Sequence, residues 1–281
     1  MMNLRLKSKL EVATIYGIIA VVSIIIFYPL AWALGLSFNS GTSLYSSSII
    51  PKEPTLEHYR WLFTSPESNY VTWYKNTLIV STVSSILSIC FTSMTAYALS
   101  RFQFVGRKGG MYAFLLLQMF PVMMAMVALY IFLNLIGLLN TLIGLIMIYV
   151  GGQIPFNAWL VKGYLDTISR ELDDAAKIDG AGPIRLFVQI LLPLITPILA
   201  IVALTNFMLP VFDFILPSII LHDKSKYTLA VGLYNFVTEK YSSNFTVFTA
   251  GAILIAVPIA AIYLFLQKYF ISGLAAGGTK G

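Results

Sequence analysis

The chain of 281 residues is poor in charge: 11% of its residues are Asp, Glu, Lys or Arg, whereas 58% are hydrophobic. Soluble globular domains carry about 25% charged residues, so the composition excludes that class. The single cysteine, Cys90, excludes a disulfide within the chain, and we expect it to be buried as a small hydrophobic residue. The two histidines, His58 and His222, are isolated and indicate no metal or catalytic site.

Charge is missing altogether from five long stretches. These stretches are residues 12–51, 76–100, 109–161, 186–212 and 241–267. A membrane-spanning helix needs about 20 mostly apolar residues, so each stretch holds one span, and the third holds two around a turn at 134–140. Such long apolar runs exclude the alternating strands of a membrane barrel. We therefore predict an all-α, polytopic fold with six spans, at 12–38, 76–100, 110–133, 139–161, 188–213 and 246–268.

The lysines and arginines of the loops predict the orientation of these spans. Six spans place both termini on one side, which holds Arg5, Lys7, Lys9, Arg101, Arg107, Lys108, Lys162, Arg170, Lys177, Arg185, Lys268 and Lys280. The opposite side holds half as many, namely Lys52, Arg60, Lys75, Lys224, Lys226 and Lys240. We therefore expect a multi-pass protein of the cytoplasmic membrane, embedded in the lipid bilayer, with both termini in the cytoplasm. The basic residues do not gather on one soluble face, so nucleic-acid binding is not expected.

The expected order along the chain follows from these spans. It is a cytoplasmic N-terminus (1–11), a first span with an outer loop (12–75), a core of five spans (76–271) and a cytoplasmic tail (272–281). Within the outer loop we predict a short surface helix near 56–63, and we expect Trp61, Trp73 and Tyr74 to lie in the membrane interface. The second outer loop has an apolar centre at 227–233, which fits a partner or pathway contact as well as packing on the membrane surface.

Two spans carry residues that are unusual for a membrane helix. Gly152 and Pro155 weaken and kink the fourth span, and broken helices often line a translocation path, although a packing kink fits the same pattern. The fifth span has four prolines between 193 and 217, which argue against a straight helix, and two polar residues, Asn206 and Asp213. Asp213 fits either a position near the outer gate or an interfacial carboxylate that reaches water.

Residues 162–192 form a polar loop between charge-free stretches. Thr167 and Ser169 are candidate N-caps, and Glu171 and Asp174 place negative charge in the first turns of a helix, where the helix dipole favours it. We call these residues the coupling loop, because a structured loop on one side of a membrane protein is typical of a contact with a soluble partner.

The loop also has features suited to close contact and to force transmission. Ala175 and Ala176 give its first helix a flat face, and Gly180 ends that helix. A second helix leads through Leu192 and Pro193 into the fifth span, so a push on the first helix would move that span. The alternative is an amphipathic loop on the lipid headgroups, but five acidic residues at 166–179 disfavour binding to anionic lipid.

The segment Asp174-Ala175-Ala176, with Gly180 and Leu192-Pro193, resembles the Glu-Ala-Ala…Gly…Leu-Pro signature of importer permeases of the ATP-binding-cassette superfamily. Asp174 stands where Glu is usual, which keeps the charge and shortens the side chain by a methylene group. The likeness extends to the maltose/maltodextrin permease subunit and implies the type I importer fold. Its further matching segments are 118–121, 127–130, 162–164, 227–232 and 273–281.

This resemblance implies partners as well as a fold. They are a second permease subunit that completes a heterodimer, an ATPase homodimer that binds ATP and Mg, and an extracytoplasmic protein that delivers maltose or maltodextrin. It assigns the ATPase contact to the coupling loop, at Glu171, Asp174, Ala175, Ala176, Gly180, Leu192 and Pro193. It also implies that the tail reaches between the two ATPase subunits, through Gly277, Gly278, Thr279 and Lys280.

The glycines of the tail do not form a phosphate-binding loop. That motif ends in Gly-Lys-Ser/Thr and opens a helix, whereas Gly278-Thr279-Lys280-Gly281 has another order. We therefore expect no ATP hydrolysis and no cofactor in this chain. An importer of another oligosaccharide or of a sugar phosphate remains an alternative. An ATP-independent carrier or a membrane-embedded enzyme is disfavoured, because ionisable residues are scarce in the spans.

Overall fold

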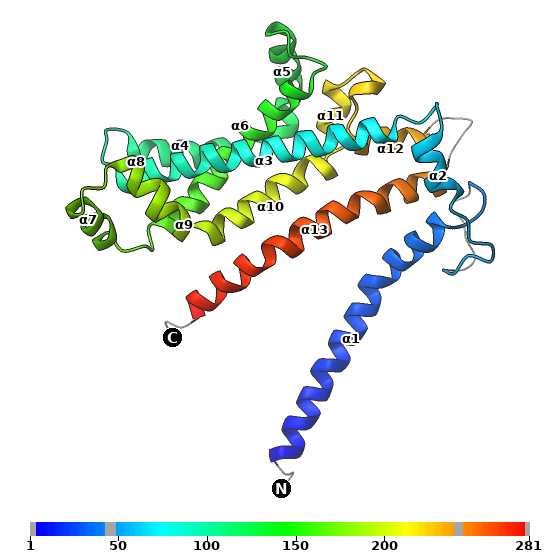
Figure 1. Ribbon diagram of the computed structural model, residues 1–281, viewed down its shortest axis with the longest axis horizontal. Helices are drawn as coiled ribbons and strands as arrows, with labels where there is room; N and C mark the ends of the chain where they lie inside the picture. The colour runs from blue at the N-terminus through cyan, green and yellow to red at the C-terminus, as the bar shows by residue number, and fades with distance from the viewer. Residues whose placement is uncertain (1–3, 43–48, 239–243, 279–281) are drawn as a thin grey trace. The chain divides into compact units, whose positions relative to one another are not determined.

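A computed structural model describes residues 4–42, 49–238 and 244–278 of the chain (Figure 1). Its regular elements are helices, and one isolated bridge joins Asn39 and Pro54. The helices are α1 (Leu4–Ser37), α2 (Glu57–Thr64), α3 (Tyr70–Arg101), α4 (Arg107–Gln118), α5 (Val122–Leu135), α6 (Leu142–Leu165), α7 (Glu171–Ile178), α8 (Pro183–Arg185), η1 (Leu186–Leu191), α9 (Leu192–Leu194), α10 (Thr196–Phe212), α11 (Ile215–Ile220), η2 (Lys224–Lys226), α12 (Leu229–Thr238) and α13 (Phe245–Gly278). The predicted all-α fold is confirmed, and α2 is the expected short helix of the outer loop.

Four of these helices are long and apolar enough to cross a membrane: Glu11–Ser37, Tyr70–Arg101, Leu142–Leu165 and Phe245–Tyr269. Two further candidates are bent pairs, so the described residues supply up to six spans if each pair counts as one. The number of spans therefore agrees with the prediction, but the third and fifth are not single helices.

Proline explains both bends. The third span breaks between Gln118 and Met123, with 103° between α4 and α5, because Pro121 has no N–H to donate and holds extended backbone there. The prediction of one continuous helix at 110–133 was therefore wrong. The fifth span bends by 77° between Leu194 and Thr196, next to Pro197 in the first turn of α10, as the prolines had indicated.

The fourth span behaves differently from the expectation. Helix α6 runs without a break from Leu142 to Leu165, although Pro155 lies inside it and Gly151 and Gly152 precede it. Helices tolerate an internal proline when the surrounding structure satisfies the freed carbonyl groups. The glycines and the proline therefore do not interrupt this span.

The chain divides into two compact units. One unit comprises residues 1–68 and 233–256, and the other comprises residues 69–232 and 257–281. In the first unit, His58 Nε2 lies 2.8 Å from the carbonyl oxygen of Asn39, and the Thr246 hydroxyl donates to the carbonyl of Gly41 at 2.7 Å. The rings of Trp61 and Phe236 meet edge to face. These contacts join the outer-loop segment to the chain around the start of α13.

In the second unit, α3 packs lengthwise against α6 and α10 (Figure 1). Small polar residues of α3 are buried along these contacts, and they are Ser81, Ser84, Ser85, Ser88 and Thr92. Small side chains let membrane helices approach closely, and the Ser85 hydroxyl also donates to the carbonyl of Ala203 at 2.8 Å. Cys90 lies on another face of α3 and is exposed, so the expectation that it is buried was wrong.

Trp73 packs inside the protein, because its side chain is only 4% exposed. Its indole Nε1 donates to the carbonyl of Lys224 at 2.6 Å, and Asn76 beside it donates to the carbonyls of Ser225 and Tyr227. The apolar centre of the second outer loop, at 227–233, forms the start of α12, and Leu229 at that start is buried. The start of α3 is therefore bound tightly to the loop that follows α11.

Replacing Gly232 with alanine is expected to destabilise this unit. A Cβ atom at Gly232 would lie 2.1 Å from ring atoms of Trp73, and the indole is held in place by its hydrogen bond. Overpacking of this kind costs about 1–3 kcal/mol or more. We expect the amount of folded chain in the membrane to fall, measured by size-exclusion profile and thermal melting in mild detergent. The control is Gly110→Ala, where the added atom meets nothing within 4 Å; equal stability of both variants would contradict the packing argument.

Candidate functional site

The first helix of the coupling loop, α7, forms where it was expected. Its first turns contain Glu171, Asp173 and Asp174, which the helix dipole favours. Neither predicted N-cap closes the helix as foreseen: Arg170 occupies the N-cap position, while the Ser169 hydroxyl accepts the N–H of Glu171 at 3.3 Å. The acidic pattern thus predicted the helix, and the capping residues alone were misassigned.

The end of α7 depends on glycine. Gly180 has φ +80°, a left-handed conformation that side chains rarely adopt, and the N–H of Ala181 donates back to the carbonyl of Ala176 at 2.8 Å. This is the bonding of a Schellman cap, which ends a helix and turns the chain away. The coupling loop therefore reverses direction sharply at Gly180.

The two alanines of α7 do not share one face. Ala176 is buried in a cluster with residues of α3, α6 and η1, whereas Ala175 is exposed. Ala175 lies between Leu172, which is 45% exposed, and Ile178, which is 87% exposed. Residues three apart share a helix face, so these three form an exposed apolar stripe. The flat face predicted from Ala175 and Ala176 together is replaced by this stripe, which we call the α7 outer face.

Charged residues flank the α7 outer face. Glu171 and Asp174 are exposed, and Lys177 Nζ lies 2.9 Å from Asp174 Oδ1. The hydrogen bond to Asp174 raises the pKa of Lys177, so this ammonium group is charged at neutral pH. Helix α7 thus presents an apolar stripe with an acidic side, a pattern typical of helices that lie in a groove of a partner protein.

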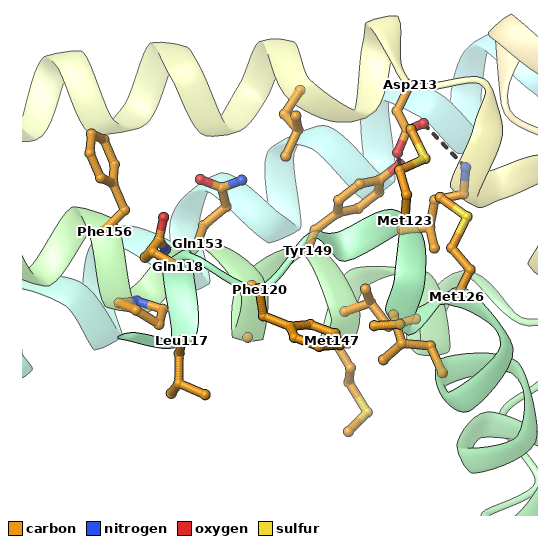
Figure 2. Close-up of a pocket in the computed structure, with 18 of the residues that line it drawn as sticks. Leu117, Gln118, Phe120, Met123, Met126, Met147, Tyr149, Gln153, Phe156 and Asp213 are labelled. Carbon is orange, nitrogen blue, oxygen red and sulfur yellow. Dashed lines mark hydrogen bonds between the residues drawn. The ribbon is translucent and has the colours of Figure 1, made fainter. Parts of the chain in front are cut away.

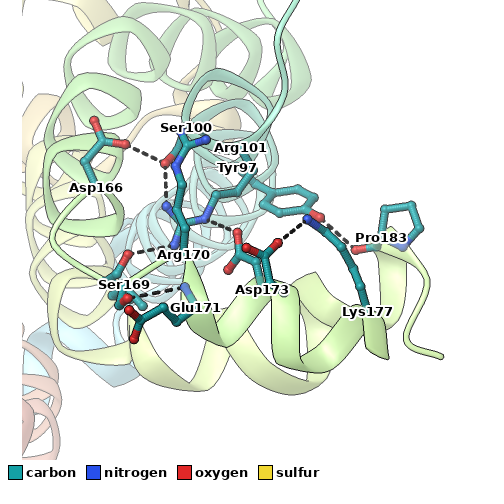
Figure 3. Close-up of polar contacts among 12 residues, drawn as sticks. Tyr97, Ser100, Arg101, Asp166, Ser169, Arg170, Glu171, Asp173, Lys177 and Pro183 are labelled. Atoms are coloured by element: carbon teal, nitrogen blue, oxygen red, sulfur yellow. Dashed lines mark hydrogen bonds and ion pairs between the residues drawn. The ribbon is translucent and has the colours of Figure 1, made fainter. Parts of the chain in front are cut away.

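A network at the end of α3 holds the opposite face of α7 (Figure 3). Arg101 Nε lies 2.8 Å from Asp173 Oδ2, and the two side chains are only 5% and 7% exposed. Arg101 Nη2 also donates to the carbonyl of Ile168 at 3.1 Å, and Arg170 Nη2 donates to the carbonyl of Ser100 at 3.0 Å. We call these contacts the α3 clamp, because they join the last residues of α3 to the coupling loop.

Two further groups extend the α3 clamp. The Ser100 hydroxyl donates to Asp166 Oδ1, and Lys162 pairs with Oδ2 of the same carboxylate. Burial raises the pKa of Asp166, but hydrogen bonds from Lys162 and Ser100 outweigh that effect and keep its pKa below the ordinary value. On the other side of the loop, the Tyr97 hydroxyl donates to the carbonyl of Pro183 at 3.0 Å, and its ring stacks on Phe187.

The remaining predicted loop and tail residues take separate places. Leu192 and Pro193 lie in α9, directly after the π-helical turn η1, where the chain enters the fifth span. Gly277 and Gly278 are the last residues of α13, whereas Thr279 and Lys280 lie outside the described residues. The predicted loop residues therefore all lie in the stretch from α7 to α9.

A cavity of about 810 Å³ opens between α4, α5, α6 and the end of α10 (Figure 2). Three of the four predicted pathway residues line it, namely Gly152, Pro155 and Asp213. The fourth, Asn206, is buried in α10, where its Nδ2 donates to the carbonyl of Val202 at 2.7 Å. The cavity is of the size at which proteins enclose small ligands, about 300–1,000 Å³.

Asp213 has two structural partners at the cavity. Its Oδ2 accepts a hydrogen bond from the Tyr149 hydroxyl at 2.9 Å, and its Oδ1 accepts the N–H groups of Ile215 and Leu216. Asp213 therefore caps the start of α11 and ties it to α6, as well as lining the cavity. Neither of its two expected roles included this cap.

Several cavity residues are not among the predicted site residues. They are polar Gln118 and Gln153 with aromatic Phe120, Tyr149 and Phe156 (Figure 2). Gln118 and Phe120 precede the proline break, so reading Pro121 as a helix break would have drawn attention to them. Rings that present apolar faces next to amide and carboxylate groups suit sugars, which have both apolar faces and hydroxyl edges.

Comparisons with known proteins agree with this architecture. The family model for binding-protein-dependent transport system inner membrane components matches residues 88–275. The galactooligosaccharides transport system permease protein GanQ of Bacillus subtilis (strain 168) is 47% identical, covering 99% of each chain. The maltodextrin transport system permease protein MdxG of the same organism is 42% identical, covering 100% of each chain.

A solved structure shares the fold. It belongs to a bacterial ABC transporter involved in the import of the acidic polysaccharide alginate, with TM-score 0.81 and 21% identity. The similarity covers 94% of this chain and 98% of the other. The helical arrangement is therefore that of importer permeases.

Proposed function

Because the chain belongs to the family of binding-protein-dependent transport system inner membrane components, we propose that it forms one half of the transmembrane pathway of an ATP-driven sugar importer. Its cargo is a neutral oligosaccharide of the maltodextrin or galactooligosaccharide class. The names of relatives at 42% and 47% identity support both cargoes, so maltose alone is too narrow. A second permease subunit completes the pathway, and an extracytoplasmic binding protein delivers the sugar.

The α7 outer face supports coupling to a separate ATPase. Ile178 and Leu172 expose apolar surface on a helix whose opposite face is held by the α3 clamp. Exposed apolar residues flanked by charge mark protein contacts. In this proposal the termini and the coupling loop face the cytoplasm. An ATPase subunit holds α7, and the tail residues Gly277 to Lys280 reach between the two ATPase subunits. ATP and Mg bind only to the ATPase.

The cavity supports a neutral cargo. Among the described residues that line it there is one carboxylate, Asp213, and no lysine or arginine. A sugar phosphate or an acidic polysaccharide carries negative charge, which cations would have to balance. The aromatic rings and the two glutamine amides instead suit uncharged sugars. This observation favours an oligosaccharide over a sugar phosphate.

Reconstitution tests this function directly. The chain, its partner permease and the ATPase are placed in liposomes with the binding protein, and uptake of labelled maltotriose, a galactose trisaccharide and glucose 6-phosphate is measured. We expect one or both oligosaccharides to accumulate only when ATP is present, and the sugar phosphate to stay outside. Uptake by the permeases without the ATPase would indicate a secondary carrier and refute the proposal.

A further inference from the structure

The coupling loop is joined to the membrane helices by two different connections. One is the chain itself, which runs from α8 through η1 and α9 into α10. The other is the α3 clamp, in which side chains of Tyr97, Ser100 and Arg101 contact residues 66 to 86 positions later in the sequence. The second connection reaches α7 itself, whereas the first begins only after the turn at Gly180.

The centre of the α3 clamp is a single buried ion pair. Arg101 contacts Asp173 through Nε, Ile168 through Nη2 and Ser100 through Nη1, so its planar group joins α7, the preceding linker and α3. An arginine makes such fixed, branched contacts, and a lysine, which carries one charged nitrogen, does not. The pair of Lys177 and Asp174, by contrast, is exposed and lies within α7.

Helix α3 continues from the clamp to the cavity. Val80, near its other end, packs in one cluster with Tyr149 and Val150 of α6. Tyr149 lines the cavity and holds Asp213 of the α10–α11 junction. Ser85 is bonded to α10 between these points. A displacement of α3 along its axis therefore acts on both sides of the cavity.

We propose that Arg101 and Asp173 are positioning residues for transport, which carry the movement of α7 to α3 and through it to the cavity. This proposal rests on the proposed function, because it requires an ATPase that moves α7. It adds a second route to the covalent one through α10. With the clamp intact, α7 and α3 move together; without it, α7 follows the ATPase while α3 stays behind.

The test uses the whole complex in liposomes, with assembly, ATP hydrolysis stimulated by sugar-loaded binding protein, and sugar moved per ATP as separate readouts. We expect Arg101→Met to lower sugar moved per ATP by about tenfold, within the usual range of coupling between sites, while stimulated ATP hydrolysis persists. The control is Lys75→Met, which removes an exposed cation at the other end of α3 and should leave all three readouts unchanged.

Two further variants separate positioning from mere stability. The double variant Arg101→Met with Asp173→Leu removes both buried charges, so it should assemble and melt like the wild type, yet keep the low sugar-to-ATP ratio. Arg101→Lys keeps the buried charge paired but loses the branched contacts, and it should assemble with a reduced ratio.

The outcomes are distinct. If the wild-type complex moves no sugar with ATP, the proposed function itself is wrong. If the wild type transports but the double variant or Arg101→Lys has the wild-type ratio, the clamp is only a structural anchor and the inference is overturned. If neither apolar variant assembles, the ratio measured for Arg101→Lys decides.

Discussion

Replacing Gly180 with valine is expected to abolish ATP-driven sugar uptake while the chain still reaches the membrane in normal amounts. Gly180 has φ +80°, and a side chain in this left-handed conformation costs about 1–3 kcal/mol, more when it is branched at Cβ. A Cβ atom there meets nothing within 4 Å in this chain, so the variant has room to fold. The distorted end of α7 and the added side chain would both disturb ATPase docking. Uptake into vesicles at matched membrane levels measures the effect.

Two other variants separate the causes. Gly182→Val, at φ −70° and also in open space, should keep uptake, since any residue adopts that conformation. Gly180→Asn tests the backbone alone, because asparagine tolerates left-handed conformations better than other residues. If uptake survives in Gly180→Asn, backbone strain explains the loss of uptake in Gly180→Val. If uptake is also lost in Gly180→Asn, the partner surface excludes any side chain at this position. Normal uptake in Gly180→Val would contradict the coupling role of this turn.

Filling the cavity is the second change with a large expected effect. Gly152 lines the cavity, and a Cβ atom there meets nothing within 4 Å. Gly152→Trp therefore adds an indole at an open position that lines the cavity, and α6 is a continuous helix at this position. We expect uptake to fall to background, with normal assembly and normal binding of the ATPase, measured by co-purification.

A tryptophan in the first span provides the matched control. Gly17 of α1 is exposed and also has no atom within 4 Å of an added Cβ. Gly17→Trp should leave uptake close to the wild-type level. Full uptake by Gly152→Trp would show that the sugar does not pass through this cavity, and the pathway would then have to lie elsewhere.

Local pattern was enough to predict much of this protein. The charge-free stretches predicted the membrane class and the number of spans, because burial of apolar length in lipid needs no knowledge of neighbouring helices. The acidic start and the glycine end of α7 predicted that helix, because caps and dipoles act within a turn or two. The prolines of the fifth span likewise predicted that it is bent.

Contacts between distant residues were beyond the reach of such patterns. The expectation for Trp73 followed its residue type, whereas its burial depends on a loop about 150 positions later in the sequence. Ala175 and Ala176 are neighbours in sequence, yet only the packing of α7 on α3 decides which of them faces outward. Pro121 was the one missed local signal, since a proline inside an apolar run already indicates a possible break.

The sequence by itself determined that this is a helical membrane protein with an acidic loop suited to a partner, because hydrophobic length and helix-end chemistry are local properties. Only the tertiary structure decided that Arg101 and Asp173 meet, that Tyr149 holds Asp213, and that Gly152, Pro155 and Asp213 surround one cavity. Arg101 and Asp173 belong to α3 and α7, and Asp213 follows α10 whereas the other cavity residues belong to α6, so the packing between these elements sets the distances.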